Sequence, residues 1–344
     1  MGNKHPIGKV CLIPNVSGVG GMVSFRAKLT QGLTQRGLQV THNLNDTPYD
    51  VVLVIGGTRD LPGLWRVKQH GVRIVQRLDG MNWIHRKTRT GLKHYLRAEY
   101  GNFILSWIRS HLADQIIYQS MFSQNWWQRV YGEIHKPCQV VLNGVDLAQY
   151  SPEGKSDRPT ELVRILLVEG TIGGGYEMGL RTAIQLGEKL SSEYSLNIEV
   201  LVVGRISERL QKAWKFPKGI HVKFMGQVAA EMIPEIDRSA HVLYAADLNP
   251  ACPNSVIEAL ACGLPVAGFN TGALSEIVSE QSGELVAYGG DPWKLDPPDV
   301  TGLAGAVNII LNDQSSYRKS ARLRAEDAFG LDRMVEGYLE VLQS

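Results

Sequence analysis

The feature that most constrains this chain is an alternation of short apolar runs with helical patterns, which starts afresh near residue 160. In the first half, a glycine-rich turn and a helical pattern over 22–35 follow the first apolar run. Strands that alternate with helices in this way are typical of βαβ units and parallel sheets. We predict strands at residues 9–14, 51–55, 73–78, 115–119 and 139–142.

A polar stretch rich in Pro and Gly, residues 151–160, separates the two halves and has the composition of a linker. After it the pattern resumes, and a chain of 344 residues is long enough for two domains. We therefore expect two doubly wound α/β domains. The predicted strands of the second half are 163–168, 198–203, 222–224, 241–245 and 265–268. The predicted helices are one that follows the glycines 173–175 and ends near 190, and two others at 255–262 and 314–342.

Several classes of protein are disfavoured by what the sequence lacks. The longest uninterrupted aliphatic run is 51–55, well below the ~20 residues of a membrane helix, and the N-terminal MGNKHPIGK has no signal-peptide core. The four cysteines form no C-x-x-C pair, and there is no HExxH, EF-hand or D-x-D sequence. We expect a cytoplasmic protein with reduced thiols, no metal and no cofactor.

Charge is distributed unevenly along the chain. Residues 1–150 contain 18 Lys and Arg against 8 Asp and Glu, whereas residues 151–344 contain 18 against 26. The basic first half predicts an anionic partner there: membrane headgroups, nucleic acid or an acidic substrate. Attraction between two oppositely charged domains would give the same asymmetry.

The most informative stretch is 247–268, DLNPACPNSVIEALACGLPVAG. Asn254 is a favourable N-cap, which would leave the amides of Ser255, Val256 and Ile257 free at a helix start. Such amides and the helix dipole suit the phosphates of a nucleotide. Glu258, one turn in, would then accept hydrogen bonds from a pair of ribose hydroxyls. Alternatively, Glu258 merely complements the helix dipole.

The segment CPNSVIEALACGLPV resembles the donor-binding motif of the family 4 retaining glycosyltransferases. Four further segments resemble that family in the same order along the chain: PNVSGVGGMVSFRAKLTQGLTQRGLQV, RLDG, VLNGVDLAQY and NTGALSEIVSEQSGELV. The resemblance implies a GT-B fold, with two Rossmann-like doubly wound parallel-sheet domains facing across a cleft. It implies an acceptor-side domain, 1–150, to which the last helix, about 328–344, returns, and a nucleotide-sugar-binding domain, 151–327.

By this resemblance the chain transfers a hexose from a nucleotide diphosphate sugar to an acceptor, with retention and without a metal. The acceptor would be a carbohydrate or a lipid-linked molecule, in polysaccharide or glycolipid biosynthesis. Glu258 would hold the ribose, and Asn254, Ser255 and Val256 would present the helix start to phosphates and sugar. Asp79 would face the donor sugar, and Gly20 and Gly21 would allow close backbone approach. The alternative is an ordinary strand-end turn for Asp79 and a tight turn without a ligand for Gly20 and Gly21.

Two departures from the family pattern concern the donor site. Where the family has a first glutamate, eight residues before Glu258, this chain has Pro250, so that contact is lost or is supplied by Asp247 or Asn249. The family's Arg and Lys after the first strand of the second domain are also missing, and Glu169 and Glu177 occupy that stretch. A leaving diphosphate needs compensating charge. The candidates are a backbone nest at Gly173, Gly174 and Gly175, and Arg205, which otherwise is a plain surface arginine.

These departures keep a second function open, a catalytically inactive nucleotide-sugar-binding or scaffolding paralogue. A nucleotide-sugar epimerase is a weaker alternative because no N-terminal acid–base group is identified. A Rossmann dehydrogenase is excluded because Gly18 and Gly20 are followed by Val23 instead of the third glycine.

Residues 83–109 combine basic and aromatic side chains, with Glu99 as the one acid from 86 to 109. On a helix this combination suits an anionic membrane surface, which would place the protein on the inner face of the membrane as a peripheral protein. The alternative is a solvated helix whose apolar face packs on its own domain. We do not expect nucleic acid as a partner, since no nucleic-acid-binding module accompanies the charge.

Overall fold

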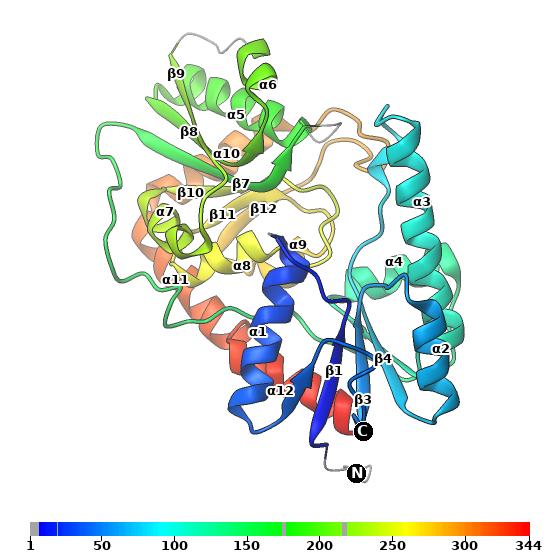
Figure 1. The fold of residues 1–344 in the computed structure, drawn as a ribbon. Helices are drawn as coiled ribbons and strands as arrows, with labels where there is room; N and C mark the ends of the chain where they lie inside the picture. The colour runs from blue at the N-terminus through cyan, green and yellow to red at the C-terminus, as the bar shows by residue number, and fades with distance from the viewer. Residues whose placement is uncertain (1–6, 19, 174–176, 215–218) are drawn as a thin grey trace. The chain divides into compact units, whose positions relative to one another are not determined.

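The computed structural model describes residues 7–18, 20–173, 177–214 and 219–344. The chain forms two compact units. Unit 1 consists of residues 1–86, 90–144 and 331–344, and unit 2 consists of residues 87–89 and 145–330. Each unit contains one six-stranded parallel sheet with helices on both faces (Figure 1).

The sheet of unit 1 has the strand order β2-β1-β3-β4-β5-β6. Its strands are β1 (Lys9–Ile13), β2 (Gln39–Thr41), β3 (Val51–Ile55), β4 (Arg73–Leu78), β5 (Gln115–Tyr118) and β6 (Cys138–Val140). Its helices are α1 (Gly21–Gln35), α2 (Leu61–Gln69), the 3₁₀ turn η1 (Ile84–Arg86), α3 (Leu92–Trp107), the π-helical turn η2 (Ile108–Leu112), α4 (Met121–Tyr131) and α12 (Leu331–Gln343).

Helices α1 and α12 cover one face of this sheet. Phe25 and Leu29 of α1 and Tyr338 of α12 pack with strand residues in one apolar core. Arg36 donates hydrogen bonds to Asp332 and Glu336, which fixes the end of α1 to α12. The final helical stretch was predicted as one helix, 314–342. It is two helices with a break at Phe329 and Gly330, where Val145 forms a parallel bridge to Gly330.

The sheet of unit 2 has the order β12-β11-β10-β7-β8-β9. Its strands are β7 (Val163–Ile172), β8 (Ile198–Ile206), β9 (Ile220–Gly226), β10 (Val242–Ala245), β11 (Val266–Phe269) and β12 (Gly283–Val286). Its helices are α5 (Met178–Tyr194), α6 (Glu208–Ala213), the turn η3 (Ala230–Met232), α7 (Ile233–Ser239), α8 (Asn254–Ala261), α9 (Leu274–Ile277), α10 (Val300–Asn312) and α11 (Gln314–Ala328).

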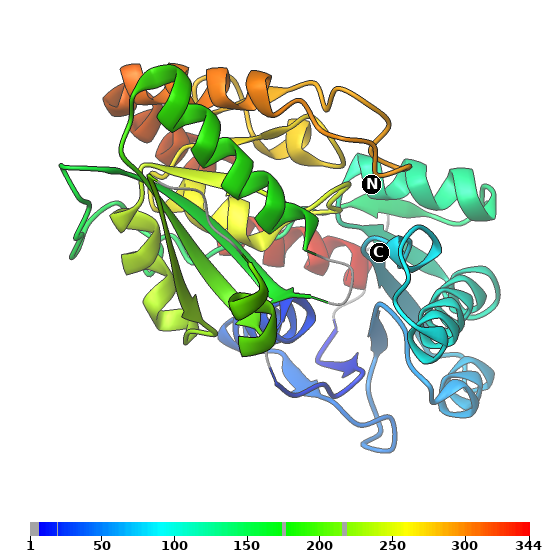
Figure 2. The same ribbon diagram turned by 90° about the horizontal axis from the view of Figure 1, so that it is seen from above.

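Helices α5 and α10 pack against one face of the second sheet, and α5 lies over its strands (Figure 2). Alternate strand residues are buried on the two faces, as a sheet covered on both sides requires. Strands β7 and β8 run several residues further than predicted, to Ile172 and Ile206. Arg205 is therefore part of a strand and does not follow one.

Both sheets reverse their direction of growth beside the first strand of the unit. In unit 1 this switch point lies between β1 and β3, and in unit 2 it lies between β7 and β10. In open α/β sheets, ligands bind at the carboxyl ends of the strands on either side of such a point. The topology therefore marks one candidate region in each unit.

Candidate functional site

A pocket opens at the switch point of unit 2. The ends of β7 and β10 and the start of α8 form its walls. The residues that line it are Val168, Glu169, Tyr244, Ala245, Ala246, Asp247, Pro250, Pro253, Ser255, Val256 and Leu274. Among the predicted donor-site residues, Ser255 and Val256 are thus part of one pocket.

Helix α8 presents its amino end to this pocket, although not with the predicted cap. The N-cap residue is Pro253, no side chain caps the helix, and Asn254 is already the first helical residue. The amide of Ile257, predicted to be free, donates to the carbonyl oxygen of Pro253 at 3.3 Å. The helix therefore starts one residue earlier than expected, and the amides of Ser255 and Val256 lie in its first turn. A helix start with free amides attracts anionic groups.

Two carboxylates, Glu169 and Asp247, line the same pocket. Burial raises the pKa of Glu169, and the negative charge of Asp247 raises it further. Burial also raises the pKa of Asp247, against a hydrogen bond from the amide of Leu248. The described part of the structure contains no hydrogen bond or ion pair for the Glu169 carboxylate. An acid pair beside the open end of a helix can accept hydrogen bonds from hydroxyl groups of a ligand.

The position of Glu169 follows from a bulge in β7. The pairing of β7 with β8 shifts between Val168 and Thr171, so Glu169 and Gly170 lie outside the regular ladder. Gly204 of β8, with φ of 145°, approaches this bulge so closely that a β-carbon there would overlap the carbonyl of Glu169. The bulge re-aims the side chain at the strand end, a frequent role of bulges beside sites.

The loop between β10 and α8 contains Pro250, which stands where the family has its first glutamate, and the two candidates to replace that glutamate, Asp247 and Asn249. Pro250 lines the pocket, and its carbonyl accepts a hydrogen bond from the amide of Ala273 at 2.8 Å. Asn249 is buried, with a positive φ of 56°, and does not line the pocket. Of the two candidates to replace the glutamate, Asp247 and not Asn249 therefore faces the pocket.

Glu258 lies on a different flank of α8 from the pocket lining. Its side chain is half-buried, and its charge raises the pKa values of Tyr150, Asp237 and Cys262 after the larger effect of burial. Asp237 belongs to α7, which packs on α8, so the Glu258 carboxylate lies toward α7. The structure does not bring Glu258 into the pocket formed by Ser255 and Val256.

Two groups were predicted to compensate the charge of the diphosphate, Arg205 and a backbone nest of three glycines, and the structure describes Arg205 and the first of these glycines. Arg205 is exposed on β8 opposite Thr171, and its guanidinium donates to the side chain of Gln227 at 2.9 Å. Gly173 directly follows β7, with a φ of 144°. Gly174 and Gly175 lie outside the described residues. Among the described residues, no group of three or more His, Cys, Asp and Glu side chains could hold a metal ion.

In unit 1, Gly20 and Gly21 lie at the start of α1, directly after the β1 loop. Gly20 is the N-cap residue, its φ is 136°, and no side chain caps the helix. Because the strands are parallel, this helix start shares the carboxyl edge of the sheet with Asp79, which follows β4. The positive φ explains the need for glycine at Gly20.

Asp79 is fixed through its backbone. Its carbonyl oxygen accepts hydrogen bonds from the indole of Trp127 at 2.7 Å and from the hydroxyl of Ser123 at 3.0 Å. Burial raises the pKa of the half-buried side chain, and the charge of Arg77 opposes this shift. Arg77 also donates to Asn143, in the NGVD segment, at 3.0 Å. The RLDG and NGVD segments are therefore joined by a buried hydrogen bond.

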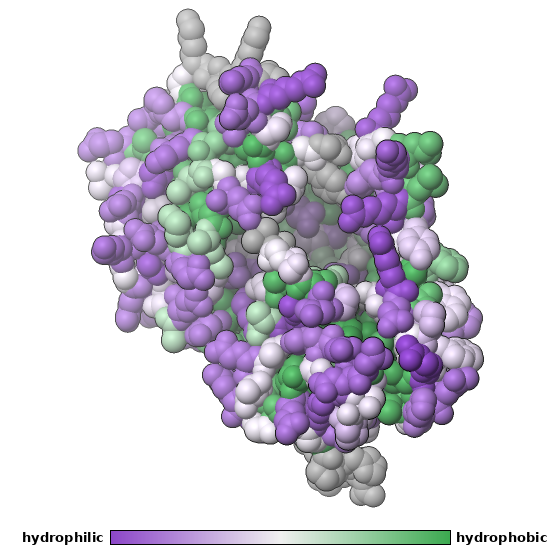
Figure 3. All heavy atoms as spheres, in the orientation of Figure 1, coloured by the Kyte–Doolittle hydropathy of each residue, from purple (hydrophilic) through white to green (hydrophobic). Residues whose placement is uncertain are grey.

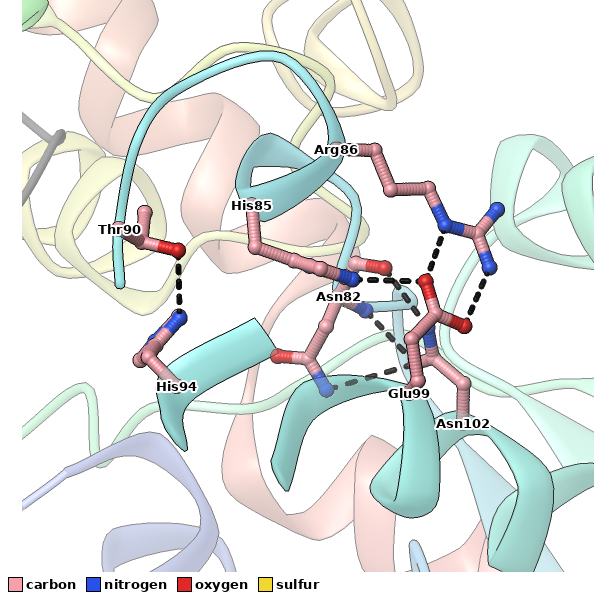
Figure 4. A network of polar contacts seen from close by, with 7 residues as sticks. All are labelled: Asn82, His85, Arg86, Thr90, His94, Glu99 and Asn102. Carbon is pink, nitrogen blue, oxygen red and sulfur yellow. Dashed lines mark hydrogen bonds and ion pairs between the residues drawn. The ribbon is translucent and has the colours of Figure 1, made fainter. Parts of the chain in front are cut away.

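A polar network holds the loop after Asp79 against α3 (Figure 4). The side chain of Asn102 binds both the amide and the carbonyl of Asn82, at 3.0 and 2.8 Å. Glu99 accepts hydrogen bonds from Arg86, and His85 bonds to it at 2.8 Å. These contacts lower the pKa of Glu99 to about 2.

Sequence reasoning did not identify Glu169 or Tyr244 as part of the site. In the sequence Glu169 is only an acid where the family has cations, and Tyr244 is only one residue of the predicted strand 241–245. Their positions in the strands could have indicated this role, because both residues lie at or near the ends of the strands that flank the switch point.

Solved structures of glycosyltransferases share the fold of this chain. Both units match the two Rossmann-like domains of the GT-B fold, as predicted. The structure of sucrose-phosphate synthase from Thermosynechococcus elongatus aligns with a TM-score of 0.73 and 16% identity, over 97% of this chain and 98% of that one. HepE from Anabaena, solved with UDP and glucose, aligns with a TM-score of 0.70 and 15% identity, over 97% and 99%. WaaG, a glycosyltransferase involved in lipopolysaccharide biosynthesis, aligns with a TM-score of 0.69 and 14% identity, over 98% and 100%.

The sequence comparisons also identify glycosyltransferases as similar proteins. Residues 164–313 match the family model described as glycosyl transferases group 1. The chain is 25% identical over 183 residues to the 2-deoxystreptamine N-acetyl-D-glucosaminyltransferase of Streptomyces fradiae, a match that covers 50% of this chain and 41% of that enzyme. Together the family match and the fold support a glycosyltransferase of the GT-B type.

Proposed function

We propose that this chain transfers a hexose from a nucleotide diphosphate sugar to an acceptor, with unit 2 binding the donor and unit 1 the acceptor. The observation that carries the proposal is the pocket at the β7–β10 switch point, into which Ser255 and Val256 bring the open end of α8. A helix start at a switch point is suited to a nucleotide phosphate.

The two acids of the pocket indicate which part of the donor enters it. Two acids offer phosphate oxygens no compensating positive charge, whereas sugar hydroxyls can donate hydrogen bonds to them. We assign the pocket beside these acids to the sugar and the amides of α8 to the diphosphate. The nucleoside would then lie toward α7, where Glu258 would accept hydrogen bonds from the ribose hydroxyls.

Departure of the nucleoside diphosphate leaves negative charge on its oxygens, which fixed dipoles and cations stabilise. In the proposed site the amides of α8 and Gly173 supply dipoles, and Arg205 supplies the cation. Because D-x-D is absent from the sequence, we propose transfer without a metal ion. Retention of anomeric configuration, membership of family 4 and the role of Asp79 beside the sugar are proposed from the motif resemblance alone.

The acceptor is proposed to be a carbohydrate or a lipid-linked saccharide. The supporting observations are the names of similar proteins, which act in lipopolysaccharide biosynthesis or on 2-deoxystreptamine. The basic balance of residues 1–150 is consistent with an acceptor that carries negative charge.

The test is a reaction with UDP-, GDP- and ADP-sugars and a panel of saccharide and lipid-linked acceptors, followed by NMR of the anomeric proton of the product. We expect transfer or donor hydrolysis from one donor class, with the donor's anomeric configuration kept and no loss of rate in EDTA. Asp79→Asn should abolish turnover and leave nucleotide affinity unchanged. Nucleotide binding without any turnover would identify an inactive binding protein, and an inverted product would refute retention.

A further inference from the structure

Helix α3 of unit 1 turns large apolar side chains outward. Leu92 is 74% exposed, Leu96 59%, Tyr100 52% and Phe103 58%. Surface side chains of this kind are ordinary when single, but a contiguous group indicates a contact surface. The space-filling view shows hydrophobic residues gathered at the surface over α3, among hydrophilic ones (Figure 3).

The spacing of these four residues makes one stripe. They follow one another at intervals of four, four and three residues, so they lie within roughly 80° of the helix circumference. Ala98 and Asn102, on the other side of the helix, are buried. The expectation that the apolar face packs on the domain holds for Ile104, which is 5% exposed, but not for this stripe.

Cations border the stripe. Lys93 and Arg97 are exposed and lie three residues before Leu96 and Tyr100, respectively, so each is a neighbour of one of them on the helix surface. In the described residues neither has an ion-pair partner. The one acid of α3, Glu99, is held by His85 and Arg86 (Figure 4), so its charge is balanced locally. The outward face of α3 is therefore apolar with net positive charge.

Hydrogen bonds tie α3 to the loop that precedes it. Asn102, on the inner side of α3, binds the backbone of Asn82, while Glu99 binds the loop through His85 and Arg86. Because α3 is anchored in this way, its outward side chains can meet a partner without reorganisation of the unit, which lowers the entropic cost of docking.

We propose that this face of α3, comprising Leu92, Lys93, Leu96, Arg97, Tyr100 and Phe103, docks on the surface of an anionic lipid bilayer. The charge of the border selects this occupant over a second copy, whose identical cations would face one another. Aliphatic and aromatic side chains flanked by Lys and Arg are the composition of helices that lie in the headgroup region. In the described part of the chain no helix is long and apolar enough to span a bilayer, so the contact is interfacial. The proposal does not depend on glycosyl transfer.

The test is flotation of the full chain with vesicles of phosphatidylcholine containing phosphatidylglycerol, compared with pure phosphatidylcholine. We expect binding to the anionic vesicles at low salt and its loss at high salt, because salt screens the attraction. Lys93→Gln with Arg97→Gln should lower vesicle affinity by about 25-fold, at about fivefold per cation. Leu96→Gln with Phe103→Gln should abolish binding. These exposed helix positions tolerate glutamine, so the fold should be kept.

The matched controls are on unit 2. Lys223→Gln with Lys319→Gln removes two exposed cations, and Leu323→Gln removes an apolar side chain that is 52% exposed. Both should bind vesicles like the wild type. Absence of flotation at low salt, or binding unaffected by the α3 variants, overturns the proposal. A dimer in light scattering that the α3 variants dissociate would assign the face to a second copy and overturn it as well.

Discussion

Gly204 of β8 passes so close to the backbone carbonyl of Glu169 in β7 that no β-carbon fits between them. This contact occurs where the ladder between β7 and β8 shifts register, and it holds Glu169 at the mouth of the unit 2 pocket. A glycine far along the chain thus fixes the position of an acid in the site.

Gly204→Ala should therefore destabilise unit 2. The added methyl group collides with backbone, which cannot move as the end of a flexible side chain can, and the φ of 145° is unfavourable for alanine. We expect a loss of about 2–4 kcal/mol in the free energy of unfolding. The control is Gly226→Ala, where φ is 71° but no atom lies within 4 Å of the added carbon. It should cost about 1 kcal/mol. Equal urea midpoints for the two variants would contradict the close approach.

The raised pKa of Glu169 predicts how stability depends on pH. The folded chain holds its proton more tightly than the unfolded chain, so the protonated carboxyl favours folding at acidic pH. That contribution is lost as the pH rises through the raised pKa. Glu169→Gln, which cannot ionise, should be more stable than the wild type at and above neutral pH and equal to it at acidic pH. Urea midpoints that differ by the same amount at every pH would show that the charge is not responsible.

Asp247 is expected to contact the donor sugar in place of the glutamate that Pro250 replaces. Asp247→Ala should weaken binding of the nucleotide sugar by about 10- to 150-fold, corresponding to about 1.5–3 kcal/mol for a hydrogen bond to a charged group. Binding of the nucleoside diphosphate alone should be unchanged or stronger, since a negative charge is removed. Glu280→Ala, at an exposed loop position, is the control. Calorimetric titration measures the affinity for the nucleotide sugar and for the nucleoside diphosphate. An equal loss of affinity for both ligands would refute a contact between Asp247 and the sugar.

Arg205 is the candidate cation for the diphosphate. Arg205→Gln should lower affinity for nucleoside diphosphates by about fivefold, the size expected for an exposed charge pair, and leave nucleoside affinity unchanged. Arg209→Gln, in the exposed first turn of α6, should change neither affinity. A similar loss for nucleoside and diphosphate would show that Arg205 acts on the base or on the fold.

The doubly wound sheets were predictable because their strands are buried on both faces. All five residues of β3 are buried, so the strand appears in the sequence as an unbroken apolar run. The start of α8 was predicted to within one residue. The cap was predicted wrongly: Asn254 is a favourable capping residue by type, but Pro253 occupies the cap position and no side chain caps the helix.

Other features depend on contacts that sequence patterns do not contain. The orientation of Glu169 requires Gly204, which lies on the neighbouring strand. The stripe on α3 has the spacing of an amphipathic helix, but that spacing does not tell which face is turned outward. The break at Gly330 reflects its pairing with Val145, a contact across almost the whole of unit 2 in sequence.

The central claim is that the open end of α8 and Glu258 bind a nucleoside diphosphate. Thermal unfolding with UDP, GDP, ADP and their sugars, each for the wild type and Glu258→Ala, tests it directly. For one base, ligand at about 100 times its dissociation constant should stabilise the wild type by about 2.7 kcal/mol and raise its midpoint by several degrees. At the same concentration Glu258→Ala should show a much smaller ligand-induced shift, measured against its own unliganded midpoint. No shift with any nucleotide, or equal shifts for both proteins, would contradict the claim.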